Sequence, residues 1–411
     1  MKTKAAFLFL GLLLSSCQGG GSETPSTAPF GESFLFGADC SSLNMVESCG
    51  GKFFDQDGKE KDLFVLLKEG GFTSTRIRIW VDPYNGNHEP YLGGSNDLET
   101  ALTLAKRAKK AGLSTMLDFH YSDFFADPAK QHKPKAWASL NGKALEQKVY
   151  SYTKESLLAF KDAGIEVAAA QIGNEINNGC CAIQATSETF GDLSSFLKQG
   201  ISALKEVYPN AKSFLHLTDL PNQAGVSWFL ESLKQNAVSY DCLGFSYYPY
   251  WHDGIEEAQT FLSSLVSQYQ KDIYLVETAY GYTDEPHADC WNQFSSSGFG
   301  EKAGYPTSPA GQKQMLQAEY EMLQSLGEHG KGIFYWEPAW LPVKGANWAS
   351  PSGAYYGDHG QDASSSEELS PYSERSLLNS WANQALFDYN GKALDSLYAP
   401  KEILLAPDLG R

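Results

Sequence analysis

Short apolar runs alternate along the chain with longer segments in which apolar residues recur at helical spacing. Eight of the apolar runs have the length of strands, and polar, turn-forming residues follow them. We predict strands over residues 34–40, 75–80, 114–119, 167–172, 213–217, 242–247, 273–276 and 332–336. The clearest predicted helices lie between them, over residues 97–111, 145–163, 190–208, 255–269 and 312–326.

Eight strands that alternate with helices predict an α/β fold, a (β/α)8 TIM barrel in a single domain. A doubly wound open sheet is the alternative, but no Gly-rich phosphate turn follows the first predicted strand. Four long irregular stretches follow strands, over residues 81–96, 121–141, 280–310 and 338–377. In a barrel they gather on the C-terminal face, where we expect them to wall a groove.

The first 33 residues differ in character from the rest. Lys2 and Lys4 precede a short apolar run that ends at Leu14-Ser15-Ser16-Cys17, a pattern typical of an export signal. It resembles a bacterial lipoprotein signal over residues 1–17 with Cys17 as the lipidated residue; an ordinary cleaved signal peptide is the alternative. Residues 18–33 are rich in Gly, Ser, Thr and Pro, which predicts a flexible tether. The catalytic domain is then expected over residues 34–411.

Charge and cysteine content limit the partners. The formal net charge of -17 argues against nucleic acid and anionic lipid as partners and favours a neutral substrate.

Six further cysteines in an exported chain allow disulfides, and the sequence does not choose among the pairings. They are Cys40, Cys49, Cys180, Cys181, Cys242 and Cys290. Their spacing lacks the paired form of a zinc site, so we expect structural roles.

Two glutamates stand where predicted strands end. Glu175 follows the run at 167–172, and Glu277 follows the run at 273–276, three strands later. In a barrel both carboxylates face one mouth, at roughly 5 Å from each other. A proton donor and a second carboxylate are what cleavage of a glycosidic bond needs. The alternative is that they are two unrelated surface carboxylates, but such residues lie more often on helices than at strand ends.

Other predicted strand ends carry polar and aromatic side chains. Arg76, Arg78 and Trp80 alternate along the second strand, so they share the barrel interior, where an arginine needs carboxylate partners. We expect Arg78 to lie beside Glu277. His120 ends the third strand and Tyr247 the sixth, and both are candidate sugar contacts.

Five motifs resemble those of glycoside hydrolase family 53, the endo-β-1,4-galactanases. They are Gly37-Ala38-Asp39, Asp118-Phe119-His120-Tyr121-Ser122-Asp123, Gln171 to Gly179, Glu277-Thr278-Ala279-Tyr280, and Tyr335-Trp336-Glu337-Pro338-Ala339-Trp340. The resemblance implies that Glu175 is the acid/base and Glu277 the nucleophile. It also implies that Asn174 binds the hydroxyl beside the reacting carbon, that Trp336 lies under that sugar, and that Asp39 belongs to the substrate site.

The resemblance has departures and one further implication. Family members often have Trp where this chain has Phe125, and another sequence where it has Cys180-Cys181-Ala182. Bacterial relatives commonly hold a calcium ion in the loop after the seventh strand. Glu285, His287 and Asp289 have matching spacing for a structural calcium, although calcium prefers oxygen ligands throughout.

The sequence therefore predicts a retaining endo-β-1,4-galactanase that acts on pectic galactan. It needs no cofactor for the chemistry, and we expect a monomer held by lipid in the bacterial cell envelope, at the outer membrane or the cell surface. Two alternatives remain open. One is a barrel hydrolase of the same clan that cuts another β-linked glycan such as mannan. The other is a non-catalytic surface lipoprotein that binds glycans.

Overall fold

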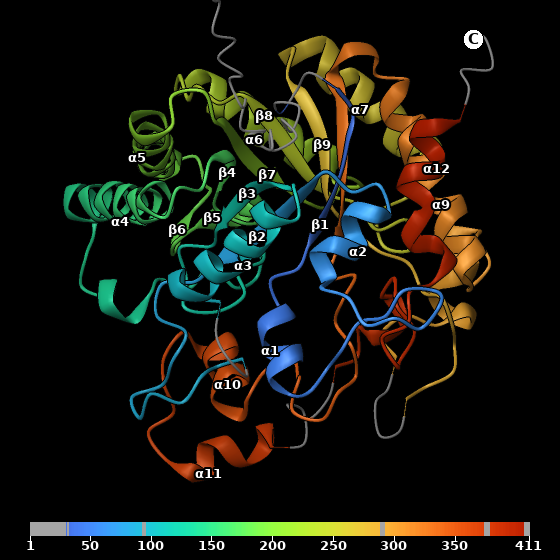
Figure 1. The fold of residues 1–411 in the computed structure, drawn as a ribbon. Coiled ribbons are helices and arrows are strands. Elements are labelled where there is room, and N and C mark those ends of the chain that lie inside the picture. Colours follow the sequence, from blue (N-terminus) through green and yellow to red (C-terminus); the bar gives the residue numbers. More distant parts are fainter. Residues whose placement is uncertain (1–29, 31–32, 93–95, 288–291, 374–378, 407–411) are drawn as a thin grey trace, which may run out of the picture.

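The computed structural model describes residues 30, 33–92, 96–287, 292–373 and 379–406. Eight parallel strands close into a barrel in the order β1-β10-β9-β8-β7-β4-β3-β2, with helices around them (Figure 1). The barrel strands are β1 (Leu35–Asp39), β2 (Ser74–Ile79), β3 (Ser114–Phe119), β4 (Val167–Ile172), β7 (Lys212–Leu217), β8 (Cys242–Ser246), β9 (Asp272–Thr278) and β10 (Gly330–Trp336). The predicted TIM barrel is confirmed, and each predicted strand boundary is within two residues of the observed one.

The longer helices between the strands form the outer layer because their apolar faces pack on the barrel. In chain order the helices are α1 (Leu43–Ser48), α2 (Leu63–Glu69), α3 (Leu98–Lys110), α4 (Gly142–Asp162), α5 (Phe190–Val207), α6 (Gln223–Gln235), α7 (Ile255–Tyr269), α8 (Glu301–Ala303), α9 (Pro309–Gln324), α10 (Pro351–His359), α11 (Ser366–Leu369) and α12 (Ala399–Leu405). A short hairpin of β5 (Gly179–Cys180) and β6 (Ile183–Gln184) follows β4. Within the described ranges no helix is long and apolar enough to cross a membrane.

The sequence pattern predicts an irregular loop over residues 338–377, but the structure has helices in part of this stretch. It contains α10 and α11, which lie together at one end of the barrel (Figure 1). Helix α10 has a full set of local signals: Ser350 caps its N-terminus by accepting from the Gly353 amide, Pro351 occupies its first turn, and Gly360 ends it with φ 68°. Its sequence has little amphipathic periodicity, so the pattern of apolar positions did not indicate a helix.

The N-terminal end of the barrel is closed by Phe30. Its ring packs against Phe214, Tyr274 and Phe334, with ring centroids 6.0 to 6.3 Å apart. Phe30 is only 5% exposed and belongs to a small apolar cluster separate from the main core. Since Leu35, Phe214 and Tyr274 lie near the starts of β1, β7 and β9, this cluster seals the end opposite the C-terminal loops.

Candidate active site

Glu175 lies just beyond β4 in a left-handed backbone conformation, with φ 47° and ψ 54°. A non-glycine residue in this region is strained, at a cost of about 1 kcal/mol, so its surroundings must hold it. Its amide donates to His216 Nδ1 at 3.3 Å, and Ser246 Oγ donates to its Oε1 at 2.6 Å. Burial raises the pKa of the Glu175 carboxyl to about 8, and the charge of Glu277 adds to the rise. Glu175 therefore keeps its proton at neutral pH, as a general acid must.

Glu277 lies near the end of β9 in different surroundings. Arg76 Nη1 donates to its Oε1 at 2.9 Å, and the Tyr248 hydroxyl donates to its Oε2 at 3.1 Å. Burial raises the pKa of Glu277, but the adjacent charge of Arg76 acts in the opposite direction. No cation in the described part of the chain contacts Glu175, so of the two carboxyls Glu175 holds the proton and Glu277 carries the charge.

Arg76 joins the nucleophile candidate to four other buried groups, one of which is Gln171, whose Oε1 accepts from Arg76 Nε at 3.3 Å. Its guanidinium also donates to Asp39 at 2.9 Å, to Asp118 at 2.8 Å and to Asn174 Oδ1 at 2.8 Å. All the partners lie at strand ends on the interior side of the barrel. The sequence-based expectation that Arg78 lies beside Glu277 is therefore wrong, because Arg76, two residues earlier on the same face of β2, takes that position.

Arg78 instead pairs with a carboxylate to which the sequence reasoning gave no role. Its Nη1 lies 2.7 Å from Oε1 of Glu337, which also accepts from the amide and hydroxyl of Ser42. Burial raises the pKa of Glu337 to about 7, against the lowering effect of Arg78. The available signal was a glutamate directly after the apolar end of β10 together with two interior arginines that needed partners.

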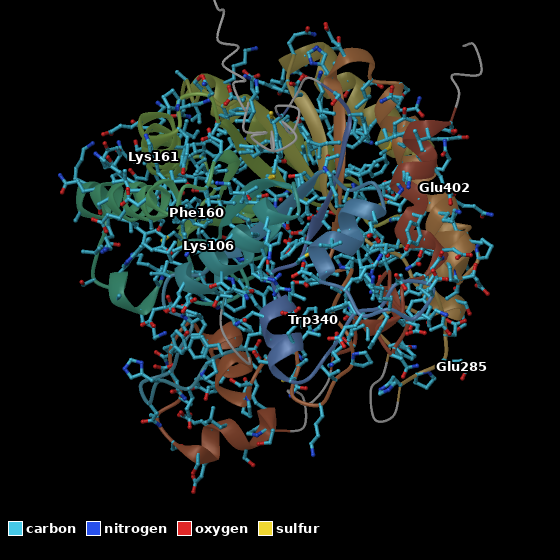
Figure 2. The ribbon with its side chains drawn as sticks, in the orientation of Figure 1. Lys106, Phe160, Lys161, Glu285, Trp340 and Glu402 are labelled. Carbon is cyan, nitrogen blue, oxygen red and sulfur yellow. The ribbon has the colours of Figure 1, made fainter. Side chains whose placement is uncertain are left out.

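A cavity of about 610 Å³ opens beside Glu175 and Glu277. Aromatic rings dominate its lining: Phe124, Phe125, Tyr248, Trp251, Trp336, Trp340, Trp348 and Trp381. Trp340 lies toward the end of the barrel at which α1 is seen (Figure 2). Flat apolar faces beside a few directed polar groups suit a sugar, whose ring faces are apolar and whose edges carry hydroxyls.

Four of the seven predicted substrate contacts line this cavity: Arg78, His120, Asn174 and Trp336. His120 accepts at Nδ1 from the Trp80 indole and the Ala126 amide, so its Nε2 carries a proton and donates to Asp118. Asn174 donates to the Ala126 carbonyl and is fixed through its amide oxygen by Arg76.

The other three predicted contacts do not line the cavity. Asp39 is fully buried against Arg76, and Trp80 is fully buried behind His120 and Phe125. The Tyr247 hydroxyl donates to the Asp253 carbonyl, while Tyr248 reaches Glu277. Side chains alternate beyond β8, so Ser246 and Tyr248 face the mouth and Tyr247 faces away. Arg76, Ser246 and Tyr248 are thus site residues that were not assigned in advance.

The proposed calcium loop is only partly described. Asp289 lies outside the described residues, and within them no group of three potential ligands gathers. The His287 ring packs against Tyr389, whose hydroxyl donates to the Glu285 carbonyl. Figure 2 shows Glu285 at the periphery, away from Trp340. The part of the loop that is seen is held by Tyr389.

Disulfides are absent among the five cysteines within the described ranges. Cys40, Cys49, Cys180, Cys181 and Cys242 are free thiols, so the expectation of disulfides is wrong for them; Cys290 lies outside the described residues. Four of the five are buried, and burial raises the pKa of each of those four thiols. They fill the core as small apolar side chains.

A TIM barrel whose mouth holds a protonated glutamate, a charged glutamate and a wall of aromatic rings defines a carbohydrate-cleaving hydrolase. Residues 35–399 match the model of glycosyl hydrolase family 53. The chain belongs to this family.

Individual relatives agree with the family match. An endo-beta-1,4-galactanase of Bacillus subtilis is 36% identical over 379 residues, which cover 89% of this chain and 84% of the relative. An arabinogalactan endo-beta-1,4-galactanase of Cellvibrio japonicus is 33% identical over 78% of this chain and 86% of its own length. The solved family 53 catalytic domain of Ignisphaera aggregans superposes with a TM-score of 0.81 at 36% identity, covering 90% of this chain and 96% of that one.

Proposed function

We propose that this enzyme is a retaining endo-β-1,4-galactanase that hydrolyses β-1,4-galactosidic bonds in pectic galactan or type I arabinogalactan. The observation that carries the proposal is the unequal environment of the two glutamates. Glu175 is half-buried, has no contacting cation among the described residues and has a pKa of about 8, whereas Glu277 is hydrogen-bonded by Arg76 and Tyr248. The galactan specificity is supported by two relatives at about one-third identity, both of which are endo-β-1,4-galactanases.

In the first step Glu277 attacks the anomeric carbon and forms a covalent glycosyl-enzyme bond. Glu175 gives its proton to the leaving oxygen as the glycosidic bond breaks. Water then enters, Glu175 takes a proton from it, and the hydroxide oxygen displaces Glu277 from the sugar. The product keeps the β configuration. After it has given up its proton, Glu175 can serve as the base. Glu277 loses its charge when it bonds to the sugar, and the loss of that charge lowers the pKa of Glu175.

Following the first released product from β-1,4-galactan by proton NMR tests the proposal. A β-configured reducing end that later mutarotates is expected. An α-configured first product means inversion and excludes Glu277 as nucleophile. Parallel assays on mannan test the alternative of another β-linked substrate. Glycan binding without any released reducing ends would support the non-catalytic alternative.

We also propose that Cys17 carries a lipid that holds the enzyme in the cell envelope. The support is the run of residues 1–17, with its short apolar stretch directly before Ser15-Ser16-Cys17. Membrane fractionation of the wild type and Cys17→Ala tests it. Release or stalled processing of the variant is expected, and an unchanged membrane fraction contradicts the proposal.

A further inference from the structure

A third carboxylate lines the catalytic cavity and has no part in the mechanism described above. Asp127 lies in the loop that follows β3 and is half-buried. Glu175 and Glu277 are the other two acidic residues in the lining. A free carboxylate in a sugar-sized cavity is a strong acceptor for hydroxyl groups.

The backbone around Asp127 is tied to the backbone around Glu175. Gln131 Nε2 donates to the Asp127 carbonyl at 3.1 Å and to the Asn174 carbonyl at 2.8 Å. Asn174 in turn donates from Nδ2 to the Ala126 carbonyl at 2.8 Å. Two side-chain amides therefore bridge the loops after β3 and β4, so the position of Asp127 relative to the acid/base is fixed.

One oxygen of the Asp127 carboxylate is available. Oδ1 accepts from the Ala129 amide at 2.7 Å, whereas Oδ2 has no hydrogen-bond or ion-pair partner among the described residues. The nearest cation along the chain, Lys130, directs its ammonium to Asp358 at 3.2 Å. The structure thus leaves Oδ2 for something that enters the cavity.

The barrel order indicates which part of the substrate that is. Strand β3 neighbours β4 and stands four positions from β9 around the barrel of eight, so the loop that holds Asp127 starts across the mouth from Glu277. A nucleophile attacks from the side opposite to the leaving group, so the leaving sugar lies away from Glu277. It therefore lies toward Glu175 and Asp127.

We propose that Asp127 binds the sugar unit on the leaving-group side of the scissile bond by accepting a hydrogen bond from one of its hydroxyls. This inference rests on the proposed role of Glu175 as acid and deepens the proposed function. Asp127 would then recognise the hydroxyls of a sugar leaving group. An artificial leaving group without hydroxyls would not use this contact.

The charge of Asp127 has a second effect, on the proton of Glu175. Burial is the largest cause of the raised pKa of Glu175; the charges of Glu277 and Asp127 raise it further, while the Ser246 hydrogen bond and Arg76 lower it. His216, which also contacts Glu175, is neutral because burial lowers its pKa well below the usual value. Loss of the Asp127 charge should therefore lower the pKa of Glu175.

The test uses Asp127→Asn, because an asparagine oxygen still accepts from the Ala129 amide. Two substrates are compared: β-1,4-galactan and an aryl β-galacto-oligosaccharide whose leaving group is an activated phenol. On galactan kcat/KM should fall about tenfold, the scale of one charge-assisted hydrogen bond, and its alkaline limb should move to lower pH. On the aryl substrate kcat/KM should stay within about twofold. Asp219→Asn, an exposed carboxylate outside the cavity lining, is the charge-matched control and should match the wild type on both.

Equal losses on the two substrates would mean that Asp127 stabilises the loop, and a lowered melting temperature would accompany them; either result overturns the proposal. Unchanged kinetics on galactan overturns it as well. If the wild type cleaves another β-glycan but not galactan, the proposed specificity fails, and the same comparison on that glycan still decides the role of Asp127.

Discussion

Arg76 and Glu277 form a buried ion pair, with 2.9 Å between Nη1 and Oε1, and both side chains are at least 90% buried. The same guanidinium holds Asp39 and Asp118. One cation therefore offsets three carboxylates in the barrel mouth. Its planar fork reaches all of them at once, which a single ammonium does not.

Arg76→Lys should consequently be a severe change although it conserves charge. We expect kcat on galactan to fall at least about 100-fold and the free energy of unfolding to drop by about 3 kcal/mol, because buried carboxylates lose partners. Weaker pairing lets the pKa of Glu277 rise, so the acid limb of the pH–rate profile should move to higher pH. Arg107→Lys, which alters a partly exposed pair with Glu47, is the control. Near-wild-type kinetics for Arg76→Lys would contradict this account.

The two glutamates should respond differently to removal. Glu277→Ala should lose several orders of magnitude in turnover and regain activity with azide, which attacks from the nucleophile's side and gives a product of inverted configuration. Glu175→Ala should still cleave aryl substrates with good leaving groups, because no proton is needed, and azide should rescue it with retention. NMR of the azide products decides between the two roles. The same product configuration from both variants would refute them.

Glu319 gives a prediction about stability. Burial raises the pKa of this carboxyl on α9 to about 8, its Oε1 accepts from Thr278, and its Oε2 is buried with no hydrogen-bond partner among the described residues. Between the ordinary carboxyl pKa and about pH 8 the folded state keeps a proton that the unfolded state gives up, so stability falls as pH rises through this window.

Glu319→Gln stays neutral and should remove this pH dependence. Relative to the wild type, the variant should gain about 4 kcal/mol at pH 8 and little at pH 4.5. Thermal melting across this range measures the difference. Glu321→Gln, exposed on the same helix, provides the matched control. An equal shift at both pH values would show that packing, and not ionisation, separates Glu319→Gln from the wild type.

Structural calcium in the loop at 285–289 stays a prediction. If the ion binds there, chelation should lower the melting temperature, and added calcium should restore it through the linkage between binding and folding. Activity at moderate temperature should persist, since neither glutamate role requires a Lewis acid. An unchanged melting temperature after chelation would remove the site.

The sequence could predict the barrel and the two glutamates because both depend on local pattern. Each strand is a short apolar run; Glu175 lies just beyond the end of β4, and Glu277 is the next-to-last residue of β9. The sequence could not predict which carboxylate each arginine contacts. Arg76 and Arg78 share one face of β2, and only the closure of the barrel decides which of them meets Glu277 and which meets Glu337. Alternation with a period of two predicts which face of a strand a side chain lies on, but not how deep in the barrel that side chain lies.

Tyr247 and Tyr248 illustrate the same limit at a strand end. Two adjacent tyrosines follow β8, and a shift of one residue decides which ring enters the mouth. Ser246 settles it, because its hydroxyl reaches Glu175 and so puts Tyr248 on the same side. The exact residue at which a strand ends is hard to predict from sequence, and the side chains of the catalytic face lie at strand ends.

Phe30 also bears on where the proposed lipid anchor would join the enzyme. Because its ring seals the N-terminal end of the barrel, Phe30 itself lies at the end opposite the catalytic mouth. With Cys17 as anchor, the intervening twelve residues allow a stand-off of at most about 40 Å. If the lipid anchor proposed above is present, it would join the enzyme on the side of the barrel opposite the mouth and so leave the cavity open to a polymer that is cut between interior sugars.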